Sequence, residues 1–112
     1  MQAFELDVLI SQQDPHTVAY LEFLRSANLS VGLYHLPSGS TDPQQPHSED
    51  EVYYIARGRG HIRVGDEDRV VQTGSIVYVA AGVAHHFHSI SQDLDILVFF
   101  APAEYTRRTP RA

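Results

Sequence analysis

Short segments with strand-like alternation follow one another along most of this chain, separated by tight breaks that are often rich in glycine. Alternate side chains of a β-strand point to opposite faces, so alternation of apolar and polar residues indicates strands. Many short strands at regular spacing are typical of a β-sandwich or a small barrel, and the sequence therefore predicts an all-β fold. The main breaks are expected at 58–60, 65–68, 73–74, 80–84 and 91–93. The expected strands cover 19–24, 29–36, 51–56, 61–64, 69–72, 75–79, 86–90 and 95–101.

The length of 112 residues suits one folded domain. We divide the chain into an N-terminal arm at 1–16, a β-barrel at 17–102 and a C-terminal tail at 103–112. The arm is ambiguous, because its apolar residues between Phe4 and Ile10 are compatible with a short helix or with an edge strand.

Composition excludes several classes of function. The chain has no cysteine, which excludes disulfides, thiolate ligands and a cysteine nucleophile, and no lysine, which excludes Schiff-base chemistry. A net charge of −6 argues against nucleic-acid binding. The chain has no glycine loop for a dinucleotide cofactor, no apolar run of membrane-spanning length and no secretory signal. We therefore expect neither nucleic-acid nor membrane partners, and a cytoplasmic location.

Two segments carry candidate chemistry: 46–58, which contains His47 and Glu51, and 74–85, which ends at His85. Glu51 begins an expected strand whose two faces are both largely apolar, so its carboxylate should be buried. An ionised carboxylate buried without a partner costs several kcal/mol, and Glu51 therefore needs a cation or strong hydrogen-bond donors. Two imidazoles and one carboxylate hold a divalent metal with coordination positions left open. The alternative is a metal-free barrel in which both histidines hydrogen-bond Glu51.

The same two segments resemble the sequence motifs of the cupin superfamily. The first motif has a glycine, two histidines, a glutamate and a second glycine, and the matching positions are Gly39, Gln45, His47, Glu51 and Gly58. The second motif has a glycine, a proline, a glycine, a histidine and an asparagine, and the matching positions are Gly74, Ala80, Gly82, His85 and Ser89. The spacing fits, while Gln45, Ala80 and Ser89 depart from the pattern.

This resemblance extends over 17–102 and implies antiparallel sheets that close a double-stranded β-helix, or jelly-roll barrel. Cupins that bind metal usually use three histidines and the glutamate, and one of those histidines is replaced here by glutamine. The residues expected at the metal are His47, Glu51, His85 and, as a fourth ligand or a water anchor, Gln45. Gln44 and Glu49 are weaker alternatives for the fourth position. The ion is expected to be iron, manganese, zinc or nickel.

Cupins commonly pair through their sheets, so the resemblance also implies a homodimer. If the segment from Phe4 to Ile10 formed a strand, it would be able to add to the sheet of a second copy and cover its edge.

Aromatic residues near the two segments are candidates to line the pocket, and each is equally compatible with the barrel core: Tyr34, Tyr53, Tyr78 and Phe87. The other histidines point to simpler roles. His86 and His88 should lie on the outer face because they flank the inward Phe87, and His61 should face solvent. His35 is expected in the core or the pocket, as a hydrogen-bonded histidine rather than a metal ligand.

We expect a metal-binding, single-domain cupin that takes a small-molecule ligand or substrate, as an oxygenase or an isomerase. No separate general base stands out, so catalytic residues stay unassigned. The alternative is a module that binds or senses a small molecule without chemistry, which the loss of one motif histidine favours. A purely structural domain is less favoured, because the buried Glu51 would then have no role.

Overall fold

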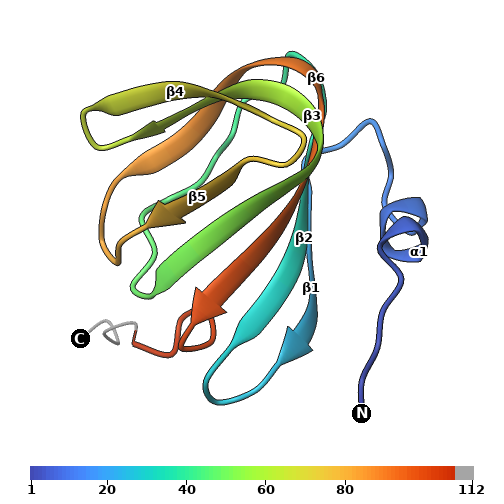
Figure 1. The fold of residues 1–112 in the computed structure, drawn as a ribbon, viewed down its shortest axis with the longest axis vertical. Helices are drawn as coiled ribbons and strands as arrows, with labels where there is room; N and C mark the ends of the chain where they lie inside the picture. The colour runs from blue at the N-terminus through green and yellow to red at the C-terminus, as the bar shows by residue number, and fades with distance from the viewer. Residues whose placement is uncertain (108–112) are drawn as a thin grey trace.

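The computed structural model describes residues 1–107. Within them lie one helix and six strands: α1 (Leu6–Ser11), β1 (Ala19–Arg25), β2 (Ser30–Leu36), β3 (Asp50–Val64), β4 (Glu67–Gln72), β5 (Ile76–Val79) and β6 (His85–Ala101). The strands pair antiparallel in the order β1-β2-β6-β3-β4, and β5 pairs with β3. The sheet is strongly curved, with β1 and β2 on one side of the molecule and β4 and β5 on the other (Figure 1). The predicted all-β, antiparallel architecture is confirmed.

Strands β3 and β6 are longer than the sequence predicted. Both run unbroken through the expected breaks at 58–60 and 91–93, so those two predictions are wrong. The strands pair from Asp50↔Ala101 to Val64↔His85, with shifts of register between Ile55 and His61. Such shifts are β-bulges, which bend a strand without ending its pairing. The glycines around position 58 therefore mark a bend inside one long strand rather than a turn between two.

This long pair places the site in the middle of the sheet. The first part of β3 pairs with β5 and the second part with β4, while β6 accompanies both. Glu51 consequently has β5 on one side, opposite Val79, and β6 on the other, opposite Phe100. Its backbone position is fixed from both directions.

Apolar side chains from the inward faces fill the interior, and each fully buried one contributes about 1.5–3 kcal/mol. The buried cluster is formed by Tyr34, Leu36, Tyr53, Ile55, Ile62, Val71, Val79, Phe87, Ile90, Leu94, Ile96, Val98 and Phe100. Buried polar groups interrupt this core, among them Asp42, Glu51, His85 and Glu104. These residues define the candidate site.

The N-terminal arm lies outside the barrel, beside β1 and β2 (Figure 1). Leu9 is buried there, and the Phe4 ring packs edge-on against Phe23 with a centroid distance of 4.9 Å. Of the two possibilities left open for the arm, the helix is observed. Strand addition to a second copy is therefore wrong for Leu6–Ser11. With six residues, α1 is too short to cross a membrane, and no other helix occurs in residues 1–107.

Candidate metal centre

Three residues from separate parts of the chain converge inside the barrel. His47 lies in the loop before β3, Glu51 is the second residue of β3, and His85 is the first residue of β6. Each offers one ligand atom, and these atoms all lie within 4.8 Å of one another. The structure thus brings together the two histidines and the carboxylate singled out in the sequence.

Their polar atoms approach closely without satisfying one another. Glu51 Oε1 lies 2.7 Å from His85 Nε2 and 3.5 Å from His47 Nδ1. None of these three atoms, nor Glu51 Oε2, has a hydrogen bond of acceptable geometry, and all four are buried. Buried polar atoms are nearly always hydrogen-bonded or bound to an ion. This donor set therefore fits a divalent cation.

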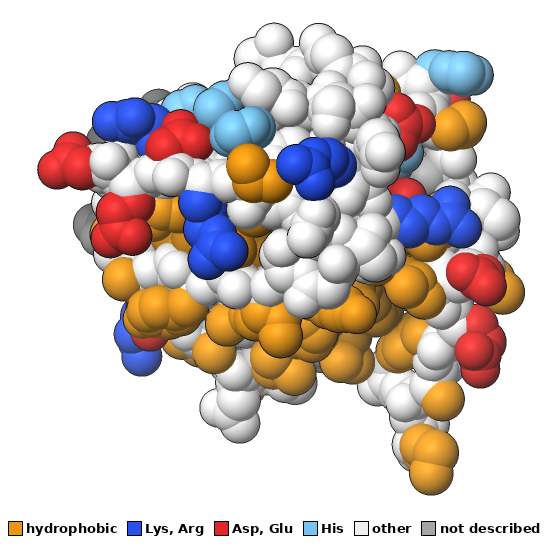
Figure 2. All heavy atoms as spheres, turned by 45° about the horizontal axis from the view of Figure 1, so that its top comes forward, with side chains coloured by type: hydrophobic (Ala, Val, Ile, Leu, Met, Phe, Trp, Pro, Cys, Tyr) orange, Lys and Arg blue, Asp and Glu red, His pale blue; other side chains and the backbone are white. Residues whose placement is uncertain are grey.

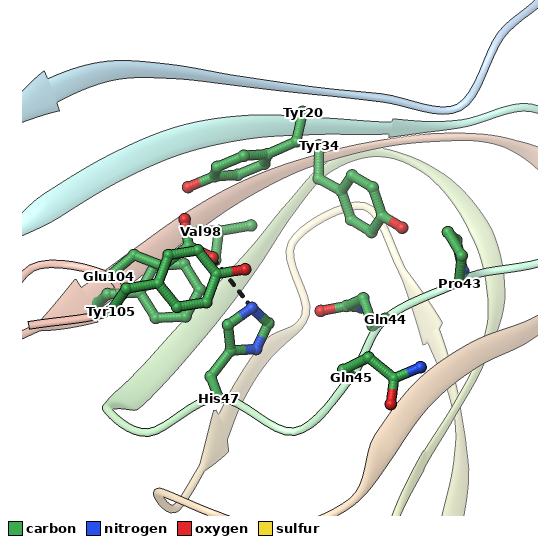
Figure 3. Close-up of a pocket in the computed structure, with 10 residues that line it drawn as sticks. Tyr20, Tyr34, Pro43, Gln44, Gln45, His47, Val98, Glu104 and Tyr105 are labelled. Carbon is green, nitrogen blue, oxygen red and sulfur yellow. Dashed lines mark ion pairs between the residues drawn. The ribbon is translucent and has the colours of Figure 1, made fainter. Parts of the chain in front are cut away.

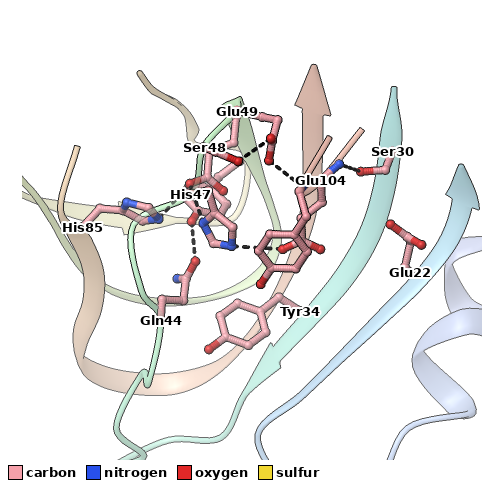
Figure 4. Close-up of polar contacts among 12 residues, drawn as sticks. Glu22, Ser30, Tyr34, Gln44, His47, Ser48, Glu49, His85 and Glu104 are labelled. Carbon is pink, nitrogen blue, oxygen red and sulfur yellow. Dashed lines mark hydrogen bonds and ion pairs between the residues drawn. The ribbon is translucent and has the colours of Figure 1, made fainter. Parts of the chain in front are cut away.

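The other nitrogen of each imidazole already has a partner. His85 Nδ1 lies 2.8 Å from the carbonyl oxygen of Val83, which can only accept, so Nδ1 carries the proton and Nε2 is left to coordinate. His47 Nε2 lies 3.0 Å from Glu104 Oε2 (Figure 4). The other nitrogen, Nδ1, is left toward Glu51. Partners of this kind fix the ring orientation and tautomer of histidines that bind metals.

The C-terminal turn holds Glu104 over the site. Its backbone N–H donates to Ser30 Oγ at 2.9 Å, and Arg25 donates to its carbonyl oxygen at 2.7 Å. Glu49 accepts backbone hydrogen bonds from Tyr105 and from Arg107, the latter at 2.7 Å. Glu49 therefore anchors this turn instead of facing the candidate metal.

Charge around the centre shifts the titration of all three residues. Burial alone would lower the pKa of His47, but Glu104 and Glu51 outweigh it and raise that pKa to about 9. Burial likewise opposes the rise in the pKa of His85, which Glu51 and the Val83 carbonyl bring about. For Glu51, burial would raise the pKa, yet the two histidines lower it. The Glu51 carboxylate is thus ionised and carries the negative charge that attracts a cation.

A cavity of about 270 Å³ opens beside His47 (Figure 3). Its wall is formed by Tyr20, Tyr34, Pro43, Gln44, Gln45, His47, Val98, Phe100, Glu104 and Tyr105. The Tyr34 hydroxyl donates to Asp42 Oδ1 at 2.5 Å. Burial is the main cause that raises the pKa of both Tyr20 and Tyr34 above the usual range for tyrosine. Both phenols therefore stay protonated.

The four aromatic residues proposed for the pocket have different places. Tyr34 lines the cavity. Tyr53 and Phe87 are buried in the core, with their rings 5.0 Å apart and edge-on. Tyr78 is 60% exposed, so its assignment to the pocket is wrong. In β5 the neighbours Val77 and Val79 take the inward positions, and strand alternation turns Tyr78 outward.

The two neighbouring glutamines also differ. Gln45 is exposed at the cavity wall. Gln44 is turned inward: its amide donates to Asp42 at 2.6 Å, and its oxygen accepts from the Tyr53 hydroxyl at 2.8 Å. Gln44 is therefore held in place by two side chains, and the role of Gln45 as a ligand or water anchor stays a prediction.

The remaining histidines lie where alternation predicted. His86 is exposed, and His61 and His88 are partly exposed. His35 is buried, with Nδ1 2.7 Å from Asp95 Oδ1 and Nε2 2.9 Å from the Pro15 carbonyl oxygen.

Sequence reasoning missed Glu104 and Asp42. Glu104 fell in the presumed tail, and Asp42 lies in a loop rich in proline and small polar residues. The Asp42 carboxylate accepts hydrogen bonds from the Phe87 backbone N–H, at 2.8 Å, and from the Tyr34 hydroxyl. No local pattern marks either residue, because both act through partners distant in the chain.

Comparison with known proteins agrees with this architecture. The chain is 55% identical to the protein SCO3923 of Streptomyces coelicolor over 104 residues, which cover 93% of this chain and 99% of that protein. The crystal structure of TT1209 from Thermus thermophilus is 27% identical, with a TM-score of 0.80, and the match covers 92% of this chain and 99% of that one.

A cupin-family protein from Methanocaldococcus jannaschii with a double-stranded β-helix fold is 22% identical, with a TM-score of 0.71 over 80% of this chain and 84% of that one. The family model described as a cupin domain matches residues 32–100. This match covers more than half of the chain and shows that the chain belongs to the cupin family.

Proposed function

We propose that this cupin binds one divalent metal ion through His47, Glu51 and His85. One observation carries the proposal: these residues bring one ligand atom each to within 4.8 Å of one another, and the atoms that face each other are buried without hydrogen bonds. Removing water from a carboxylate is costly, so the fold would not retain such a group without a compensating charge. A metal ion would supply that charge in place of the proton that His47, with its pKa raised to about 9, carries at neutral pH, and it would be held by the nitrogens that face Glu51.

The proposed substrate is a small oxygen-bearing molecule, and the reaction class is an oxygenation or an isomerisation. When bound, the ion would supply Lewis-acid chemistry and, if it is iron, chemistry with dioxygen. The cavity of about 270 Å³ beside His47 has room for such a molecule. Of its two protonated tyrosines, Tyr20 offers a hydroxyl hydrogen to a ligand oxygen, whereas the Tyr34 hydroxyl already donates to Asp42 and offers only its oxygen as an acceptor. Glu104 holds the His47 ring in place.

A second candidate is a cupin that binds or senses the molecule without transforming it. The composition of the cavity wall favours it. Tyr20 and Tyr34 stay protonated because burial raises the pKa of each, so neither is available to take up a proton. Glu104, the carboxylate on this wall, is already paired with His47. In the described residues, therefore, the wall presents no free general base.

Metal content tests the centre directly. We expect dialysed His85→Ala to contain one equivalent of metal less than the wild type, as measured by elemental analysis. The matched control is His16→Ala, which removes an exposed imidazole in the N-terminal arm and should leave that equivalent in place. Equal metal content in the two variants would reject the site.

Turnover then separates the two functions. Iron-loaded protein that consumes dioxygen with a panel of catechols, thiols or keto acids supports the enzyme. Tight binding of a panel member without turnover supports the sensing module.

We also propose a cytoplasmic homodimer. α1 exposes Val8 (53%), and the segment before it exposes Phe4 (43%). A hollow lined by Phe23, Leu97 and Phe99 remains between the arm and the sheet. Apolar surface of this kind favours coverage by a second copy.

A further inference from the structure

A second group of potential metal ligands lies on the outside of the barrel, on three adjacent strands. His61 of β3 is paired directly with His88 of β6, and Asp68 of β4 is paired with Arg63, two residues from His61. Alternation turns all of these side chains outward, because Ile62 lies between them on β3 and is buried. Figure 2 shows histidine and charged side chains grouped on one face of the molecule.

The three side chains meet around the carboxylate of Asp68. His88 Nε2 lies 2.7 Å from Asp68 Oδ2, and His61 Nδ1 lies 3.5 Å from Oδ1. One ligand atom from each residue falls within 4.8 Å of the others. The side chains are between 32% and 40% exposed, so an ion has access from solvent.

The backbone prearranges this group. Strand pairing fixes the three Cα positions, so the site does not depend on a flexible loop. His88 Nδ1 lies 3.0 Å from Ser89 Oγ, which orients the ring and turns Nε2 toward Asp68. Ser89 has a φ of 48°, in the left-handed region that few residues other than glycine adopt. Its hydroxyl is thereby placed against His88.

We propose that His61, Asp68 and His88 form a second metal site, for a borderline divalent cation such as zinc(II). Two imidazoles and one carboxylate are a donor set that zinc accepts, with a further position left for water or another ligand. The bound ion would link β4, β3 and β6 on the outer face. Two neighbours on the same face modulate it: the Arg63 charge opposes a cation, whereas His86, whose ring centroid is 5.5 Å from that of His88, offers a further imidazole.

This inference does not depend on the centre inside the barrel, and zinc titration of the full-length, untagged protein tests both. A tag is avoided because polyhistidine binds zinc itself. Calorimetry should show that the wild type binds two equivalents of zinc. His88→Ala and Asp68→Asn should each weaken one of them at least tenfold, which is the lower end of the loss seen even for residues that only support metal ligands.

His85→Ala should instead remove the other equivalent and leave the outer one. His16→Ala, which removes an exposed histidine in the N-terminal arm, is the matched control and should change neither. A single equivalent in the wild type that His85→Ala abolishes would overturn the outer site. So would a second equivalent that binds equally well in His88→Ala and Asp68→Asn. Retained circular dichroism in both surface variants would show that the losses are local.

Discussion

At the scale of single residues, Glu104 determines which nitrogen His47 presents to the centre. With its carboxylate 3.0 Å from Nε2, the remaining Nδ1 faces Glu51. Glu104→Ala should lower metal affinity by roughly 10–100-fold, the usual cost of losing such a supporting group. Glu104→Gln keeps an oxygen that accepts the Nε2 hydrogen and should retain most of the affinity.

Competition with a coloured chelator measures this affinity. Glu5→Ala is the matched control, because it removes an exposed glutamate of the N-terminal arm whose side chain makes no capping hydrogen bond. If Glu104→Ala bound metal as tightly as Glu5→Ala, the supporting role of Glu104 would be disproved.

A second residue-scale prediction concerns His35, which lies in the barrel wall away from the centre. Burial would lower its pKa, but hydrogen bonds to the Pro15 carbonyl and to Asp95 outweigh it, and the pKa is raised. Both ring nitrogens have acceptors, so the imidazolium form is the satisfied one. Because the folded pKa lies above the unfolded value of about 6.5, the stabilisation is complete below pH 6.5 and is lost as pH rises through the folded pKa.

Urea unfolding of the wild type and His35→Gln across this range measures the effect. The difference in free energy of unfolding between them should be largest at low pH and should shrink as pH rises. A difference independent of pH would contradict the proposed charge state.

The sequence and the structure agree best where a residue's role follows from its own strand. His85 and Glu51 could be placed inward because alternation and motif spacing fix their faces. Glu104 could not, since its contact with His47 arises only after β6 has carried the chain across the barrel. Tyr78 was misplaced for a related reason: the face of a short strand is ambiguous when both faces carry apolar residues, as Val77, Tyr78 and Val79 do.

At the scale of elements, the bend shared by β3 and β6 depends on Gly58. Its φ is +99°, and a Cβ there would lie 2.1 Å from the carbonyl oxygen of Asp93. The sequence marked a break here because glycine clusters usually mean turns. Only the pairing partner, which is distant in sequence, shows that the glycine permits close approach within a continuous strand.

Substitution at Gly58 should therefore destabilise the fold by more than the backbone strain alone. Gly74 is the matched control: its φ is +94°, but an added Cβ would meet nothing within 4 Å. Gly74→Ala should lower the free energy of unfolding by about 1–2 kcal/mol, because alanine is strained in the left-handed backbone conformation. Gly58→Ala should lower the free energy of unfolding clearly more, because the backbone of Asp93 must also move. Urea unfolding compares the two, and equal losses would show that the approach to Asp93 is not limiting.

At the scale of the whole molecule, the barrel divides into two chemically distinct surfaces. The centre and its cavity lie inside, whereas the arm with α1 lies against the outer side of the sheet (Figure 1). Leu9 is buried by its own chain, but Val8 on the same helix is not. Assembly and metal binding should therefore be separable by substitution.

The proposed homodimer gives the sharpest test of this separation. Val8→Asp replaces an apolar side chain that is exposed in the single chain by a charged one. The fold should therefore be retained while the dimer contact is lost. Light scattering should give twice the protomer mass of 12.5 kDa for the wild type and a lower mass for Val8→Asp. Ser11→Asp, at an exposed polar position of the same helix, should keep the wild-type mass. Metal content should be the same in all three proteins, because α1 contributes no residue to the centre. A mass unchanged by Val8→Asp would mean that the exposed face of α1 is not the dimer contact.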